Sequence, residues 1–167
     1  MKAITILQPW ASLITAGDKR FETRSWKTPY RGPIAIHAGK KSIFEYFQKI
    51  VPKSLRLKII DTLTKHGNGM GVLQNLPLGA VVATAELVEC WRIDTTRPIT
   101  GDLIFVNEKG ETKSFADETG AEILFGDFTR GRYAWELKNV KTLENPIPAK
   151  GMQGLWEWEG SAKLWTN

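Results

Sequence analysis

The chain has 167 residues, which is enough for one domain with a hydrophobic core of its own. A single Cys and two His residues exclude a disulfide framework and a multi-Cys zinc site, and we predict no metal site. No apolar run reaches the roughly 20 residues of a membrane span, and the first ten residues lack the layout of a signal peptide. We therefore expect a soluble, cytoplasmic protein without a membrane partner.

The first part of the chain is predicted to contain short strands around one helix. Alternating β-branched residues indicate the first strand. Pro9 suits the first turn of a helix, and Gly17 suits its C-terminal stop. In chain order we expect a strand over 2–7, a helix over 9–16, an extended segment over 20–26, a turn over 28–33 and a strand over 34–38.

Two helices and a mainly β remainder follow. Ser42 with Glu45 forms a capping box, and Ser54 can cap a second helix. We expect helices over 42–50 and 54–63, the second ending at a loop with Gly67, Gly69 and Gly71. We then expect strands over 79–90, 103–106, 132–140 and 155–158, with a rigid extended connector over 146–148.

Strands at both ends with helices between them are typical of an α+β fold. The expected architecture is a small closed or half-closed β-barrel decorated by helices. Neither a repeat nor a linker divides the chain, so we predict a single domain over 1–167 with its core at about 2–158.

The net charge of +5 is concentrated in one segment. Residues 19–41 contain seven Lys or Arg residues and one acid, Glu22, so this segment carries +6 and the rest of the chain −1. Such a segment is typical of a patch that binds nucleic-acid phosphates. The alternative is that these side chains point to several faces and are simply solvated.

The segment 20–26 has a pattern of its own. In an extended conformation, side chains alternate between two faces. One face would carry Arg20, Glu22, Arg24 and Trp26, and the other Phe21, Thr23 and Ser25. Glu22 would then lie between two guanidiniums. The group is either an ion-pair ladder that stabilises the strand or a site in which Glu22 orients arginines toward a phosphate or a base edge.

Gly17, Lys19, Glu22 and Arg24 match the pattern GxKxxExR, and in this the sequence resembles the ASCH domain family. Segments 4–11, 30–38, 126–127, 131–135 and 154–156 also look like the family, so the resemblance covers most of the chain, roughly residues 2–158. It implies a PUA-like β-barrel, related to domains that bind RNA, with the signature beside a cleft for nucleic acid or a nucleotide. We therefore expect RNA, single-stranded nucleic acid, or a nucleotide or nucleoside as the partner.

The expected nucleic-acid-binding residues are Lys19, Glu22, Arg24, Trp26, Arg31, His37, Lys40 and Arg132. Lysine and arginine side chains would contact phosphates, and the Trp26 ring could stack on a base. His37 lies at a strand end, where it could contact a phosphate or act as an acid or base. Lys40 lies just before a helix N-terminus, which favours anions. Arg132 would extend the patch if its strand lies near the first strands. The choice between RNA and DNA, the base preference and the oligomeric state are left open.

The alternative is a hydrolase that acts on a modified nucleoside or on RNA. Some small bacterial proteins that resemble this chain in the signature deacetylate N4-acetylcytidine with a Thr, a Lys and a Glu. The resemblance aligns their Lys with Lys19 and their Thr with Glu22, while the adjacent Thr23 would point to the opposite face. Glu118 and Glu122 match the third residue by rough position only. In this hydrolase Lys19 and Glu22 would be catalytic, and no cofactor is expected. A third possibility is a module that binds an acidic protein.

Overall fold

The computed structural model describes residues 1–41, 47, 49, 51–68, 73–96, 102–115 and 121–160. The chain divides into two compact units, each built from separate segments. Unit 1 contains residues 1–18, 33–85 and 140–167, and unit 2 contains residues 19–32 and 86–139. Two long strands, β4 (Ala80–Thr96) and β7 (Tyr133–Pro148), contribute residues to both units. The single domain stays a prediction.

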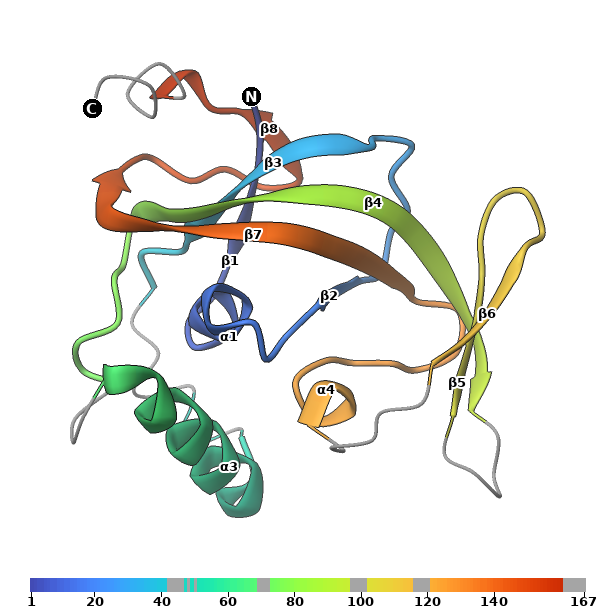
Figure 1. The fold of residues 1–167 in the computed structure, drawn as a ribbon, viewed down its shortest axis with the longest axis horizontal. Helices are drawn as coiled ribbons and strands as arrows, with labels where there is room; N and C mark the ends of the chain where they lie inside the picture. Colours follow the sequence, from blue (N-terminus) through green and yellow to red (C-terminus); the bar gives the residue numbers. More distant parts are fainter. Residues whose placement is uncertain are drawn as a thin grey trace. The chain divides into compact units, whose positions relative to one another are not determined.

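Unit 1 is a sheet with helices. Its strands β1 (Lys2–Ile6), β3 (Gly32–Ala38) and β8 (Leu155–Glu157) combine with parts of β4 and β7 in the order β7-β4-β3-β1-β8 (Figure 1). β1 and β3 are parallel, whereas β1 and β8 are antiparallel. Residues 34–38 of β3 are all buried, as expected of a strand inside a sheet that is covered on both faces.

Among its described residues, unit 1 has the helices α1 (Trp10–Ala16) and α3 (Lys53–Leu63) and the π-helical turn η1 (Thr64–Asn68). Helix α1 ends at Gly17, whose φ of 84° is the left-handed conformation that glycine adopts without strain. No described helix is long and apolar enough to cross a membrane.

Unit 2 contains β2 (Phe21–Arg24), β5 (Leu103–Val106), β6 (Thr112–Phe115) and the short helix α4 (Ala121–Leu124). With parts of β4 and β7 they form the order β2-β7-β4-β5-β6. Phe21 anchors the signature strand in an aromatic core, where its ring lies 5.2 Å from Phe105 and 5.1 Å from Phe115. Burial of such rings supplies much of the stabilisation of a small core.

Most predicted elements are observed, within two residues at each end: the strands at 2–7, 34–38, 103–106 and 155–158 and the helices at 9–16 and 54–63. The extended segment 20–26 forms the shorter strand β2. The cap expected of Ser54 was wrong, because Pro52 occupies the N-cap position. The predicted helix over 42–50 lies outside the described residues apart from Phe47 and Lys49, as do Gly69 and Gly71.

The predicted connector over 146–148 was wrong, because these residues continue β7. In unit 1 this part of β7 is an edge strand, where proline is tolerated since its missing N–H faces no neighbour. The strands predicted over 79–90 and 132–140 are both longer in the structure, where they are β4 and β7. In neither unit do the strand pairings of the described residues close into a ring. The α+β class is therefore confirmed, and the closed barrel stays a prediction.

Candidate functional site

A buried cluster of charges surrounds the signature strand in unit 2. The side chain of Lys19 is only 2% exposed, and its Nζ donates a hydrogen bond to Phe21 O and lies 3.7 Å from Glu22 Oε2. The other oxygen of Glu22, Oε1, lies 3.0 Å from Arg24 Nη2. Burial lowers the pKa of Lys19, while the nearby carboxylates of Glu22 and Glu122 act in the opposite direction. Glu22 thus lies between an ammonium and a guanidinium.

Arg20 does not take the position expected for it. Its guanidinium lies 4.9 Å from the centre of the Phe115 ring and pairs with Glu122 at 3.4 Å. β2 begins at Phe21, so the strict alternation of side chains does not extend back to Arg20. The expectation of Glu22 between two guanidiniums was therefore wrong, since Lys19 takes the place of Arg20.

Glu122 joins this cluster from α4. Its buried carboxylate accepts hydrogen bonds from Arg20 N, at 3.0 and 2.8 Å, and from Phe21 N, at 3.0 Å. Burial raises the pKa of Glu122, and the two backbone donors and the positive charge of Lys19 oppose that rise. Glu122 is one of the two residues that the resemblance offers for the catalytic glutamate of the deacetylases. The other residue, Glu118, lies outside the described residues. No local pattern distinguishes Glu122, so its place could be found only from the structure.

Trp26 packs against Trp135, and Trp135 lies on the same face of the sheet as Glu22. In the β2–β7 pairing Trp135 lies directly opposite Glu22, and such partners share a face. The half-buried Trp26 ring meets Trp135 edge to face, with centroids 4.6 Å apart. Trp135 is fully buried, and its Nε1 has no hydrogen-bond partner among the described residues. This face therefore combines charged groups, an indole ring and an unused N–H donor.

Three other residues of unit 2 are engaged elsewhere. Arg31 donates to Glu89 and, at 2.8 Å each, to the carbonyls of Thr28 and Tyr30. Arg132 Nε lies 3.2 Å from Asp127 Oδ2. Thr23 Oγ1 accepts a hydrogen bond from Asp127 N at 3.0 Å, on the face opposite to Glu22. Thr23 is thus not placed to substitute for the threonine of the deacetylases.

The remaining two expected site residues belong to unit 1. His37 is buried in β3, where its Nε2 lies 3.1 Å from Ala149 O and its ring packs edge-on against Trp156. Burial lowers the pKa of His37, so its neutral form is favoured. Lys40 follows the same strand and is exposed. His37 is therefore an interior residue, whereas Lys40 remains available to a ligand.

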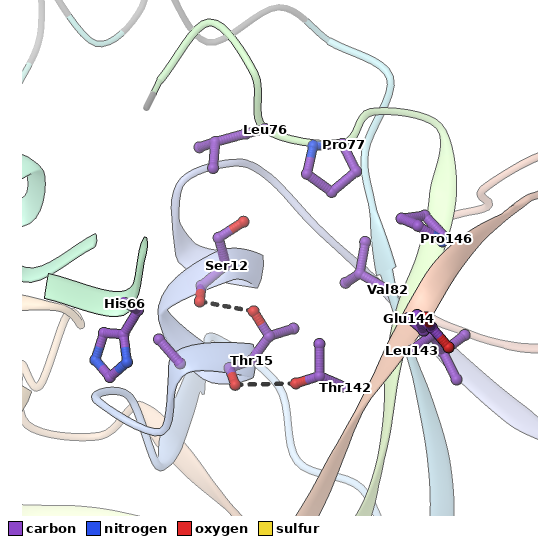
Figure 2. A pocket seen from close by; sticks show the side chains of 11 residues that line it. Ser12, Thr15, His66, Leu76, Pro77, Val82, Thr142, Leu143, Glu144 and Pro146 are labelled. Carbon is purple, nitrogen blue, oxygen red and sulfur yellow. Dashed lines mark hydrogen bonds between the residues drawn. The ribbon is translucent and has the colours of Figure 1, made fainter. Parts of the chain in front are cut away.

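Unit 1 also contains a pocket of about 390 Å³ (Figure 2). Ser12 and Thr15 of α1 line it together with Thr142 of β7, and Thr142 Oγ1 donates to Thr15 O at 3.1 Å. Its lining includes His66, which pairs with Asp18 at 2.7 Å, and Glu144, but no Lys or Arg among the described residues. The pocket therefore does not suit a polyanion. Nor does the described part of the chain contain a group of three or more His, Cys, Asp or Glu residues that could hold a metal ion.

A model of the ASCH domain family matches residues 4–147, and the chain belongs to this family. It is 31% identical to activating signal cointegrator 1 of Homo sapiens over 87 residues and to that of Mus musculus over 88 residues. Each match covers 52% of this chain but only 14% of the relative, so the chain spans a small part of these proteins.

A crystal structure of a mutant ASCH protein from Zymomonas mobilis is also similar to this chain. The superposition has a TM-score of 0.47 at 15% sequence identity, and it covers 98% of this chain and 94% of that one.

Proposed function

We propose that this ASCH domain binds RNA or a nucleotide and recognises a base with the Glu22–Arg24 pair of β2. The supporting observation is the arrangement of that pair. The buried ammonium of Lys19 holds one oxygen of Glu22, and the other lies 3.0 Å from a guanidinium that is 26% exposed. A carboxylate and a guanidinium side by side present acceptors and donors to the edge of a base.

The neighbouring aromatic side chains support the same ligand. Stacking of one base on an aromatic ring is worth about 1–3 kcal/mol, and Trp26 is partly exposed beside the charged pair. Trp135 is fully buried and packs edge to face against Trp26, so it supports the stacking ring from within. Base recognition therefore rests on Glu22, Arg24 and Trp26.

The residues that contact phosphates in this proposal differ from those predicted from the sequence. Burial argues against a direct phosphate contact by Lys19, which instead fixes Glu22. Arg24 keeps a phosphate contact through the guanidinium donors that do not face the base, and the exposed Arg20 and Lys27 lie close to it in sequence. The PUA-like barrel and a cytoplasmic location belong to the same proposal and need their own tests.

Binding to a fluorescein-labelled single-stranded RNA of about 12 nucleotides tests the proposal by fluorescence anisotropy over a range of salt concentrations. We expect Arg24→Ala to weaken binding about tenfold and to reduce the slope of log K against log salt by about 0.7. Arg92→Ala, which removes a guanidinium paired with Asp94 elsewhere in unit 2, is the matched control. Equal affinities of wild type, Arg24→Ala and Arg92→Ala would contradict the assignment.

A second function is favoured by one observation, the buried Lys19 with its lowered pKa between two carboxylates. In this hydrolase, neutral Lys19 accepts a proton from a water molecule that attacks the acetyl carbonyl of an N4-acetylated cytidine. The C–N bond then breaks, the exocyclic amine takes the proton from Lys19, and acetate and cytidine are released. Glu22 orients Lys19, and no cofactor takes part.

Hydrolysis can be followed by chromatographic separation of N4-acetylcytidine and cytidine. If the domain is this enzyme, Lys19→Gln should lower kcat by about 100-fold or more, because the proton acceptor is lost. The wild-type rate should rise with pH and level off below the ordinary pKa of lysine, since the active form is the neutral amine. A lack of turnover at every pH by a correctly folded wild type would reject the hydrolase and leave the binding function intact.

A further inference from the structure

Unit 1 has an edge where several segments of its sheet end together. Because β1 and β3 are parallel, with Ile6 opposite Ala38, the residues after both strands emerge at the same edge (Figure 1). β8 is antiparallel to β1, so the residues before β8 come to this edge as well. The start of β4 lies at this edge too, because Gly79 N donates a hydrogen bond to Ala38 O and Ala149 N donates one to Gly79 O. We call residues 7–8, 39–41, 77–79 and 149–154 the edge surface.

Side chains of β1 and β3 hold the loop 149–154 of the edge surface in place. His37 Nε2 donates to Ala149 O at 3.1 Å, and Thr5 Oγ1 donates to Met152 O at 2.9 Å. Gly151 lies so close to His37 that a Cβ at this position would be 2.4 Å from the ring. The loop is therefore fixed by the buried His37 and the partly buried Thr5 and has a defined conformation.

Cationic and apolar side chains are mixed on the edge surface. Leu7, Leu78 and Met152 are 40%, 42% and 51% exposed, which makes them three of the five exposed large hydrophobic residues in the described part of the chain. Lys40, Lys41 and Lys150 are also exposed, and no ion pair between described residues involves them. The four segments contain no Asp or Glu, so their net charge is +3.

This composition complements single-stranded nucleic acid. Two of the three exposed apolar side chains have a lysine close by: Lys150 lies two residues from Met152, and the stem of Lys40 lies over Gly79, next to Leu78. Phosphates and bases alternate in a similar way along a single strand, where lysines neutralise phosphates and apolar side chains pack against bases. A surface without carboxylates has nothing that would repel the strand.

We propose that the edge surface of unit 1 is a second contact for single-stranded nucleic acid, separate from the base-recognition residues on β2. Lys40 and Lys150 bind phosphates, and Met152 with Leu7 packs against bases. This inference rests on the proposed RNA-binding function, which it extends to residues outside the signature.

The anisotropy assay with the same RNA tests it through charge-matched variants of the full chain. Lys40→Gln combined with Lys150→Gln should weaken binding about tenfold and lower the salt slope by about 1.4, the value for two phosphate contacts on a single strand. Met152→Gln should weaken binding about fivefold with an unchanged slope, because it removes a contact with a base. Lys53→Gln combined with Lys141→Gln removes the same charge from other exposed positions and should leave affinity within about twofold.

The possible outcomes separate this inference from the proposed function. If Arg24→Ala weakens binding but the Lys40/Lys150 double variant binds like wild type, the edge surface is overturned and the function of β2 stands. Equal losses in both lysine pairs would also overturn it, since only overall charge would then matter. If wild type binds no RNA, both proposals fail. Binding to vesicles that contain phosphatidylserine is measured as well. A protein that binds these vesicles but not RNA would assign the edge surface to membranes.

Discussion

Among single residues, Glu122 connects the signature to a distant part of the sequence. Its carboxylate accepts hydrogen bonds from the backbone N–H groups of Arg20 and Phe21, which are 102 and 101 residues away in the chain. A buried backbone donor that loses its partner costs about 1–3 kcal/mol. Glu122 therefore fixes the backbone between Lys19 and the start of β2, on which the position of Glu22 depends.

Replacing this carboxylate should destabilise the protein. We expect Glu122→Ala to lower the free energy of unfolding by about 2–4 kcal/mol, because two backbone donors lose their acceptor. Glu122→Gln should cost less, since its amide oxygen still accepts. Urea denaturation followed by circular dichroism measures both. Glu159→Ala, at an exposed position, is the matched control, and a Glu122→Ala protein as stable as this control would contradict the role of Glu122.

Sequence reasoning located part of this site. The signature identified Lys19, Glu22 and Arg24, and alternation along a strand correctly placed Glu22 and Arg24 close together. It misplaced Arg20 because the strand begins one residue later. Alternation could not foresee the burial of Lys19, which depends on how the segments of unit 2 pack around it.

Among the elements, the loop before β8 shows how a single glycine permits close packing. Gly151 lies against the ring of His37 and near Thr5 Oγ1, where a Cβ would be 2.4 and 2.8 Å from its neighbours. Real Cβ atoms do not approach other atoms so closely, so any larger residue must displace the loop or the ring. The edge surface depends on this loop.

Gly151→Ala should therefore lower the free energy of unfolding by about 1–3 kcal/mol through overpacking. Thermal denaturation measures the loss. Gln153→Ala changes an exposed side chain of the same loop and should have an effect within about 0.5 kcal/mol. A Gly151→Ala protein as stable as Gln153→Ala would show that the loop adjusts freely, contrary to this account.

The elements that sequence reasoning missed are those with weak local signals. β6 and α4 are four residues each, too short for an alternating or helical pattern to be recognised. β7 was predicted to end before the Pro146-Ile147-Pro148 segment, because proline usually interrupts a strand. Its position at the edge of unit 1 removes that restriction, and edge positions cannot be recognised from sequence alone.

Over the whole molecule, most of the positive charge in segment 19–41 is paired with carboxylates. Five of the seven basic residues in segment 19–41 face carboxylates, and their partners are Glu22, Glu89, Glu108 and Glu122. Three of these four acids come from distant parts of the chain, so a local count of charge overstates the free positive charge of the segment. Only Lys40 and Lys41 have no carboxylate partner among the described residues, and both lie on the edge surface.

The central claim is that Glu22 and Arg24 recognise a base as one unit, and a double-mutant cycle on RNA affinity tests it most directly. Glu22→Gln, Arg24→Gln and the double variant are compared with wild type by fluorescence anisotropy at a fixed salt concentration. We predict that each single variant weakens binding about tenfold and that the double variant is hardly weaker than either, since each change already breaks the unit. Losses that simply add, or an unchanged affinity in all three variants, would contradict the claim.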